Sequence, residues 1–294
     1  MFQKLIAPEP LHLPAVTMEQ LRSCAVEFYA YDDVPASEEE IIRRVEDADG
    51  VLLSLCTPLS ENTLMHCARL KYIGLCCSLY EDESCTCHLP TVRKKGITIT
   101  GVSDYGDKGV PEFVIARLTD LLHGFGDRMW RERPYELTDI PVGVLGFGAT
   151  GALVARALKH FDADVSYFCR APKPEVKDIP YMELGEMLER CDILCSCLNK
   201  NVTLLTAEAL EKWTGGKILV NTSLSPSWDR DAVKKWVGEG NFLICDSLMA
   251  LGDPELMTCP NVICAGKFSG GSAQGNLRLG SGVVENVRRY LEKE

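Results

Sequence analysis

Residues 141–161 read as a strand, a glycine-rich turn and a helix, and this unit constrains the fold more than any other stretch. An apolar run at 142–145 precedes the pattern G-x-G-x-x-G at Gly146, Gly148 and Gly151, and apolar residues then recur at helical spacing. The first glycine allows a tight turn, the second lets a pyrophosphate approach the backbone, and the third allows helix and strand to pack closely. The helix N-terminus offers free N–H groups and a positive dipole end to phosphates. The unit therefore predicts a dinucleotide-binding site, with a plain structural turn as the alternative.

Length, composition and charge narrow the class of protein. The chain has 294 residues, enough for two domains, and its 46% apolar and 25% charged composition is that of an ordinary soluble protein. A formal net charge of -11 disfavours nucleic acid and anionic membranes as partners. The N-terminus lacks the apolar core of a signal peptide, and no apolar run approaches the length of a membrane span. We therefore expect a cytoplasmic protein with a small-molecule substrate.

The 14 cysteines fall into two kinds. Cytoplasmic thiols are mostly reduced, so cysteines in apolar stretches are interpreted as small core residues. These are Cys24, Cys56, Cys67, Cys191, Cys195, Cys245 and Cys264. A second group comprises Cys76, Cys77, Cys85, Cys87 and His88, with C-C and C-x-C spacings instead of the C-x-x-C of zinc knuckles. We expect a thiol-rich loop without metal there, and zinc binding is the alternative.

Strands alternate with helices along the whole chain, which predicts parallel sheets. The expected strands are residues 4–7, 50–56, 71–76, 97–100, 142–145, 165–168, 193–198, 217–221, 242–245 and 261–264. Ser37 and Glu40 form a capping box that opens a helix. The other expected helices are residues 62–69, 110–122, 153–161, 184–188, 207–213, 229–237 and 275–291.

Six motifs occur in this order: ARLKYIG, KKGITITGV, VPEFVIARLTDLL, GVLGFGATG, GGKILVNTS and PNVICAGKFSGG. In order and spacing they resemble the D-isomer-specific 2-hydroxyacid dehydrogenase family. The resemblance implies two Rossmann-like α/β domains with parallel sheets and an active site in the cleft between them. It implies a substrate domain at 1–101 and 272–294, a dinucleotide-binding domain at 102–271, and a homodimer formed through the latter.

The end of the strand after the glycine motif favours NADP(H) over NAD(H). NAD-preferring sites carry an acid about 20 residues after the glycines, which holds the ribose 2′-hydroxyl. Here that position is Cys169, and Arg170 and Lys173 follow. An arginine pairs with a 2′-phosphate that a carboxylate would repel. The alternative is that both cations are solvated loop charges.

Further cofactor contacts are expected where later strands end, with Asp246 near the nicotinamide amide and Thr222 and Ser223 near its ribose. The complete predicted set is Gly146, Phe147, Gly148, Ala149, Thr150, Gly151, Cys169, Arg170, Lys173, Cys197, Leu198, Thr222, Ser223, Asp246, Lys267, Ser269 and Gly270.

The catalytic positions depart from the family pattern. The arginine that follows N-T-S in the family is Leu224 here, and the histidine that follows P-N-V is Lys267 at that spacing. The glutamate expected soon after Asp246 is absent, since the stretch reads SLMAL and the next carboxylate is Asp253. The predicted catalytic positions are therefore Lys267, Leu224 and Asp246.

The substrate side also differs from the family. The family's glycine-rich substrate loop reads Cys76-Cys77-Ser78 here. We expect these residues and Tyr105 to contact the substrate, with Tyr80 and His88 as further candidates. Without an arginine at 224 the substrate need not be a simple 2-keto acid. Its charge would then be met by Lys108, Arg278 or Lys267.

Several interpretations of these departures remain open. In the first, the protein is a reductase in which Lys267 protonates a carbonyl or imine as hydride arrives from the nicotinamide, burial and the nicotinamide charge having lowered the lysine pKa. In the second, Lys267 only binds an anion and the protein is a nucleotide-binding sensor. An unmodified 2-hydroxyacid dehydrogenase and a Schiff-base lysine are further alternatives.

Overall fold

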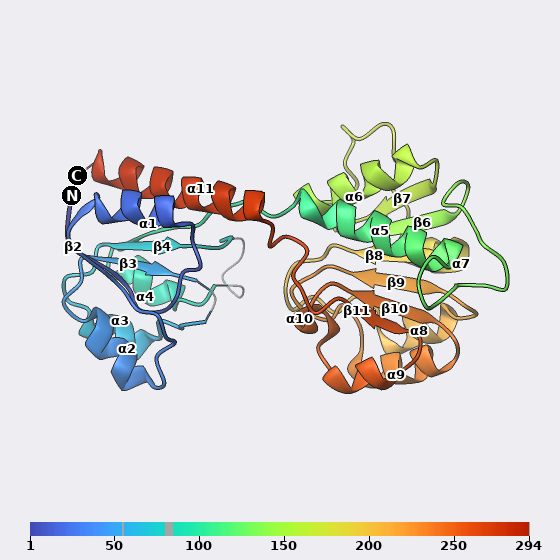
Figure 1. Ribbon diagram of the computed structural model, residues 1–294, viewed down its shortest axis with the longest axis horizontal. Coiled ribbons are helices and arrows are strands. Elements are labelled where there is room, and N and C mark those ends of the chain that lie inside the picture. The colour runs from blue at the N-terminus through green and yellow to red at the C-terminus, as the bar shows by residue number, and fades with distance from the viewer. Residues whose placement is uncertain (55, 80–84, 294) are drawn as a thin grey trace. The chain divides into compact units, whose positions relative to one another are not determined.

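The protein forms two compact units in the computed structural model, which describes residues 1–54, 56–79 and 85–293. The first unit comprises residues 1–105 and 273–294, and the second comprises residues 106–272 (Figure 1). The resemblance implied divisions after residues 101 and 271, and the compact units divide after residues 105 and 272.

The first unit is a parallel sheet covered by helices on both faces, with strand order β2-β1-β3-β4-β5. Its strands are β1 (Phe2–Ala7), β2 (Ala25–Ala30), β3 (Gly50–Leu53), β4 (Tyr72–Leu75) and β5 (Thr98–Thr100). Its helices are α1 (Ala15–Arg22), α2 (Glu38–Val45), α3 (Glu61–His66), α4 (Leu89–Lys94) and α11 (Ala273–Leu291).

Successive strand residues of the first unit enter two different cores, because side chains alternate across a sheet. Leu5 and Leu52 pack with α1 and α11, whereas Ile6, Val51 and Leu53 pack with α2, α3 and α4. Figure 1 shows α11 lying beside α1, so the C-terminal helix completes the unit that the N-terminus begins.

The second unit is a larger parallel sheet with strand order β11-β10-β9-β8-β6-β7. Its strands are β6 (Pro141–Leu145), β7 (Asp164–Phe168), β8 (Ile193–Ser196), β9 (Ile218–Asn221), β10 (Phe242–Cys245) and β11 (Val262–Cys264). Its helices are α5 (Gly109–His123), α6 (Ala149–His160), α7 (Leu184–Arg190), α8 (Ala207–Lys212), α9 (Arg230–Gly238), α10 (Leu248–Leu251) and the 3-10 helix η2 (Pro254–Thr258).

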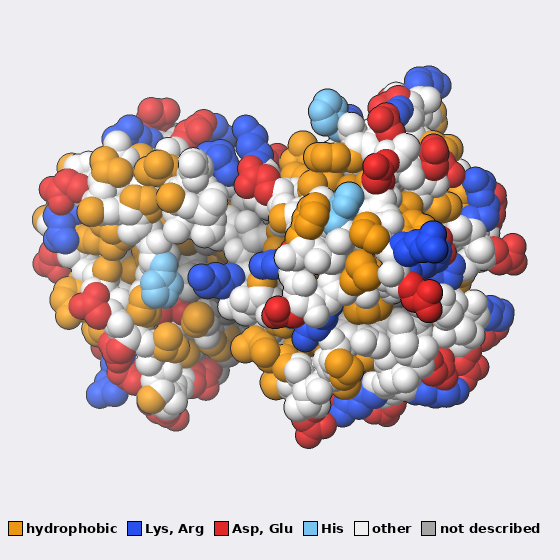
Figure 2. Space-filling model, turned by 45° about the vertical axis from the view of Figure 1, so that its right-hand side comes forward, with side chains coloured by type: hydrophobic (Ala, Val, Ile, Leu, Met, Phe, Trp, Pro, Cys, Tyr) orange, Lys and Arg blue, Asp and Glu red, His pale blue; other side chains and the backbone are white. Residues whose placement is uncertain are grey.

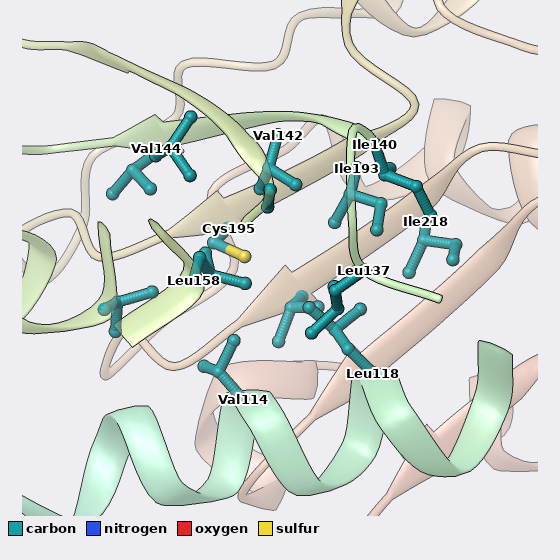
Figure 3. Close-up of a cluster of buried hydrophobic side chains, with 14 of the residues drawn as sticks. Val114, Leu118, Leu137, Ile140, Val142, Val144, Leu158, Ile193, Cys195 and Ile218 are labelled. Carbon is teal, nitrogen blue, oxygen red and sulfur yellow. The ribbon is translucent and has the colours of Figure 1, made fainter. Parts of the chain in front are cut away.

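Two apolar cores fill the faces of this second sheet. Figure 3 shows Val114 and Leu118 projecting from α5 toward strand side chains that include Cys195 and Ile218. Helix α6 contributes Leu158 to the same core, whereas α7, α8 and α9 pack on the opposite face.

Strand order reverses at β6, and this places the functional edge. The chain leaves β6 for β7 on one side and then returns to place β8 on the other. Ligands of open α/β sheets bind at the carboxyl ends of the strands beside such a reversal. The glycine-rich turn follows β6 directly, so it lies at this position.

Most expected elements are present, and the structure adds several that the sequence analysis did not predict. The expected parallel sheets and the Ser37 helix cap are confirmed: Glu40 N donates to Ser37 Oγ at 3.3 Å. The added elements are α1, β2, α4, α10 and η2. Strand β2 is an edge strand with mostly exposed or half-buried side chains, so it lacks the continuous apolar run of the buried strands. Residue 55, in the expected strand 50–56, lies outside the described residues.

The core prediction for the cysteines is wrong at one position. Cys56 is exposed, because it lies in the loop after β3 and not within the strand. Cys264 is half-buried, and the other five of that group are buried as predicted: Cys24, Cys67, Cys191, Cys195 and Cys245. No helix among the described residues has both the length and the apolar character needed to cross a membrane.

Helix α6 approaches β6 as closely as two backbones allow. A Cβ placed on Gly151 would overlap with the carbonyl oxygen of Gly146. Gly146 itself has φ +88°, a backbone conformation that favours glycine. These two residues therefore set the position of the α6 N-terminus against the end of β6.

Replacing Gly151 with alanine should displace the turn and destabilise the protein by about 1–3 kcal/mol, because the backbone cannot make room for the added methyl group. Gly185→Ala is the matched control, since a Cβ there meets no atom within 4 Å, and it should be neutral or slightly stabilising. Urea denaturation of both variants measures the difference. Equal stability of Gly151→Ala and wild type would contradict the close-packing argument.

Candidate active site

The glycine-rich turn has the geometry of an anion site. Gly148 is the N-cap of α6, and a Cβ built on it would meet no atom within 4 Å. No described side chain caps this helix end by a hydrogen bond. The N–H groups of the first helical turn and the positive end of the α6 dipole therefore face open space. Residues 146–151 therefore have the backbone donors that a pyrophosphate site needs.

The turn also gathers an aromatic and a cation from β7 and the loop that follows. The Phe147 ring stacks on Tyr167 with centroids 4.0 Å apart, and Lys173 Nζ lies 5.9 Å from the Phe147 centroid. The backbone N–H of Lys173 donates to Tyr167 Oη at 2.8 Å, which anchors the loop. Cys169 is half-buried and its thiol donates to Ala171 O at 2.9 Å, while Arg170 is exposed at the end of β7. Lys173 is thus brought to the turn, and Arg170 lies at the adjoining strand end.

The ends of β8 and β9 are tied to each other by side chains. Ser223 Oγ accepts from the backbone N–H of Leu198 at 3.0 Å, and Thr222 Oγ1 donates to Ser196 O at 3.2 Å. Cys197 Sγ lies 3.8 Å from Thr222 Oγ1. The two hydroxyls therefore order the strand ends, and their contact with the nicotinamide ribose stays a prediction.

Asp246 is the most deeply placed polar group of the site. It is fully buried at the end of β10, and its Oδ2 accepts from Ser269 N at 2.9 Å and from Ser269 Oγ at 2.7 Å. Its Oδ1 is buried with no hydrogen-bond partner among the described residues. A buried acceptor in this state calls for a donor, such as the carboxamide N–H group of a nicotinamide. Together with the open turn at Gly148, this unpaired oxygen fits a nicotinamide dinucleotide.

Lys267 is hydrogen-bonded to Asp246 through the backbone, but its side chain is exposed whereas that of Asp246 is buried. Its backbone N–H donates to Asp246 O at 2.8 Å, which fixes the loop after β11. The Lys267 side chain is exposed, so the burial on which the sequence argument relied is not provided by the protein. Gly270 is buried in the same loop.

The positions of the other two catalytic groups of the family are apolar or otherwise engaged. Leu224 is half-buried directly after Ser223 and has no polar atom to offer a ligand. The carboxylates nearest in sequence after Asp246 belong to Asp253 and Glu255, and both pair with Lys234, at 2.8 and 3.1 Å. Neither carboxylate is thus left to orient a proton donor.

The predicted substrate residues belong to the first unit. The side chains of Cys76 and Cys77 are buried in its two cores, after the end of β4. Ser78 Oγ donates to Val102 O at 3.1 Å, and the carbonyl of half-buried Tyr105 accepts from Arg278 Nε at 2.8 Å. Their contact with substrate stays a prediction. Tyr80 lies outside the described residues.

Burial makes several of the thiols poor nucleophiles. Burial raises the pKa of Cys197 to about 12 and the pKa of Cys191 to about 11. Burial likewise raises the pKa of Cys76 above its usual range.

Within the described ranges, no three His, Cys, Asp or Glu side chains are arranged to hold a metal ion. Exposed His88 instead pairs with Thr91, Nδ1 to Oγ1 at 2.9 Å.

The sequence analysis missed one residue at the turn. Asp107 accepts a hydrogen bond from Thr150 Oγ1 through its Oδ1. It precedes α5 by two residues and lies 43 positions before Thr150 in the chain. No motif marks it, so only the three-dimensional arrangement identifies it.

Comparison with known proteins gives a family match that covers the second unit. A family model described as "D-isomer specific 2-hydroxyacid dehydrogenase, NAD binding domain" matches residues 118–265. A hydroxypyruvate reductase of Blautia hydrogenotrophica is 24% identical over 302 residues, covering 94% of this chain and 91% of that protein. A glyoxylate reductase of Thermofilum pendens is 26% identical over 313 residues, covering 96% and 90%.

Solved structures of low sequence identity share the whole fold. An acyclic imino acid reductase in complex with NADPH and D-Arg aligns with TM-score 0.86 and 20% identity, over 99% of this chain and 97% of that one. An NAD-dependent formate dehydrogenase from Staphylococcus aureus, in complex with NAD, aligns with TM-score 0.79 and 18% identity, over 99% and 96%. The family match covers half of the chain, and it includes all six strands of the second sheet. The chain belongs to the D-isomer specific 2-hydroxyacid dehydrogenase family.

Proposed function

We propose that the protein is an NAD(P)H-dependent reductase that reduces a carbonyl or imine group, with Lys267 as the proton donor. The observation that carries the proposal is the open, uncapped turn at Gly148, beside the strand reversal at β6. Family membership supports nicotinamide-dependent oxidoreduction. The identity of the donor and of the substrate goes beyond that support.

Each group of the site has one task in this proposal. The N–H groups of the α6 N-terminus bind the pyrophosphate, and Asp246 Oδ1 accepts from the nicotinamide carboxamide, which orients the ring. When bound, the reduced nicotinamide supplies the hydride. Lys267 Nζ donates the proton to the oxygen or nitrogen of the reduced group and so prevents an unstable anion from forming. Leu224 gives an apolar contact where a 2-keto acid would need a cation.

The exposure of Lys267 sets a condition on this mechanism. The protein itself leaves the Lys267 side chain open to water. The proposal therefore requires bound nicotinamide and substrate to cover the amine and to place positive charge beside it. Both changes favour transfer of the proton to the substrate.

The substrate class is set by what the site lacks. The Leu224 side chain cannot pair with a carboxylate, so we do not restrict the substrate to the 2-keto acids that the names of the glyoxylate and hydroxypyruvate reductases suggest. The neighbour described as an acyclic imino acid reductase has the same fold, which supports including imines among the candidates.

The alternative is a nucleotide-binding sensor without turnover. The absence of an Arg at 224 and of a Glu that could orient a donor favours it, since Asp253 and Glu255 are held by Lys234. A sensor would bind the dinucleotide as tightly as an enzyme and yet leave NADPH unconsumed with every substrate.

NADPH should bind about ten- to hundred-fold more tightly than NADH, because Arg170 and Lys173 follow β7, where NAD-preferring sites carry an acid, and charge-assisted bonds are strong. Arg170→Ala should reduce this preference to near unity, while Lys177→Ala, which removes an exposed lysine of the same loop, should leave it unchanged. Isothermal titration calorimetry measures both affinities. Equal wild-type affinities for the two cofactors would remove the argument for NADP.

Lys267→Ala should lower kcat at least about 100-fold with NADPH affinity changed less than about two-fold, because it removes the proton donor and not the phosphate site. NADPH oxidation against panels of keto acids, aldehydes and imines finds the substrate and measures kcat. Lys267→Arg separates the two roles of the cation, since it keeps the charge but does not release a proton near neutral pH. An active Arg variant would mean that residue 267 binds an anion only, and a wild type inactive on every panel would favour the sensor.

The protein should form a homodimer through the second unit, in a reducing, cytoplasmic environment. Hydrophobic side chains are visible at the surface of this unit in Figure 2, and Phe125 and Phe161 are 73% and 47% exposed. Sedimentation equilibrium should give twice the chain mass, and Phe161→Glu should weaken the dimer. Tyr29→Glu, in the first unit, is the control, and a monomeric wild type would refute this assembly.

A further inference from the structure

Asp107 brings a carboxylate to the glycine-rich turn. Its Oδ1 accepts from Thr150 Oγ1, in the first turn of α6. Its other oxygen, Oδ2, is buried, and none of the described residues offers it a hydrogen-bond donor. Buried acceptors are nearly always satisfied, so this oxygen is suited to receive a donor from a ligand.

The backbone around Asp107 is held firmly against the loop after β11. A Cβ on Gly106 would lie 3.2 Å from the Cα of Gly270, and one on Gly109 would overlap with the carbonyl oxygen of Ser269. A side chain at position 109 would prevent this approach of the two segments. The carboxylate is therefore fixed in position before any ligand arrives.

The surroundings of Asp107 suit a contact with a hydroxyl and not with a phosphate. Helix α5 begins two residues after Asp107, and Thr150 connects the carboxylate to the start of α6. Both helices direct positive dipole ends toward this region, which stabilises an anion there. A phosphate is itself an anion with acceptors only, so it cannot satisfy Oδ2. The missing partner must be a hydrogen-bond donor.

The order of the strands in the second sheet indicates which half of a dinucleotide would donate to Asp107 Oδ2. Arg170 lies at the end of β7, on one side of β6, and Asp246 lies at the end of β10, on the other. The Asp107 carboxylate lies near Cys197, which directly follows β8. Burial is the main cause of the raised pKa of the Cys197 thiol, and the negative charge of Asp107 raises it further. Asp107 is therefore on the Asp246 side, where a nicotinamide half would lie. That half offers two kinds of donor, the ribose hydroxyls and the carboxamide, and Asp246 is placed for the carboxamide.

We infer that Asp107 Oδ2 accepts a hydrogen bond from a hydroxyl of the nicotinamide-side ribose. The inference rests on the proposed dinucleotide site and adds a residue to it. Asp107 thereby selects for a ligand that continues beyond the pyrophosphate, because ADP has no second ribose. Its bond to Thr150 holds the carboxylate in the orientation that leaves Oδ2 free.

The test compares binding of ADP and ADP-ribose to the full chain by isothermal titration calorimetry. Asp107→Ala should lower affinity for ADP-ribose about ten-fold, the effect of losing one hydrogen bond to a charged group. Affinity for ADP should change less than about two-fold. Asp107→Asn keeps an acceptor oxygen and should recover part of the loss. Asp127→Ala removes an exposed carboxylate of the same unit and controls for net charge. Thermal unfolding of each variant checks that the fold is intact.

Two results would overturn the inference. If Asp107→Ala tightens ADP and ADP-ribose equally, the carboxylate only repels the phosphates. If it weakens both ligands equally, Asp107 supports the turn and does not contact the ribose. A wild type that binds neither ligand, and does not bind NADPH, would refute the dinucleotide site itself and the Asp107 contact with it, an outcome distinct from both.

Discussion

The contact between Gly146 and Gly151 is the constraint on which the rest of the structure depends. It brings the N-terminus of α6 against the end of β6, at the strand where sheet order reverses. Because every strand pair in this sheet is parallel, the ends of β7 to β11 lie at the same edge as that helix end. A single close approach of two backbones thus places the N-terminus of α6, the proposed phosphate site, at the same sheet edge as the ends of five later strands.

Polarity changes along this edge in the order that a nicotinamide dinucleotide requires. Cationic side chains, Arg170 and Lys173, lie at the β7 end, and N–H donors follow at the turn. Buried carboxylate oxygens of Asp107 and Asp246 come next, and both lack donors within the described structure. Cations and N–H groups suit phosphates, whereas unpaired carboxylate oxygens suit hydroxyl and amide groups. In the proposed reductase, Lys267 and Leu224 make the reacting end chemically different from that of a 2-keto acid dehydrogenase.

The sequence predicts the parts of the fold whose signals are local, and it misses those that depend on distant contacts. Buried strands such as β6 and β10 are continuous apolar runs, and Ser37 and the glycine motif mark helix starts. Edge strand β2 has no such run, and Cys56 lies in a loop where an apolar neighbourhood suggested a strand. At the site, the sequence identifies the candidate residues, but it does not show which groups they bond to or how exposed they are. Nothing in the sequence relates Asp107 to Thr150, or indicates that the Ser223 hydroxyl is bound to Leu198 and that the Lys267 side chain is exposed.

A crystal structure of the protein with saturating NADPH tests the central claim most directly. The account predicts the pyrophosphate against the backbone N–H groups of the α6 N-terminus, and the nicotinamide carboxamide hydrogen-bonded to Asp246 Oδ1. A complex with the nucleotide bound elsewhere, or crystals in which this edge of the sheet stays empty at saturation, would contradict it.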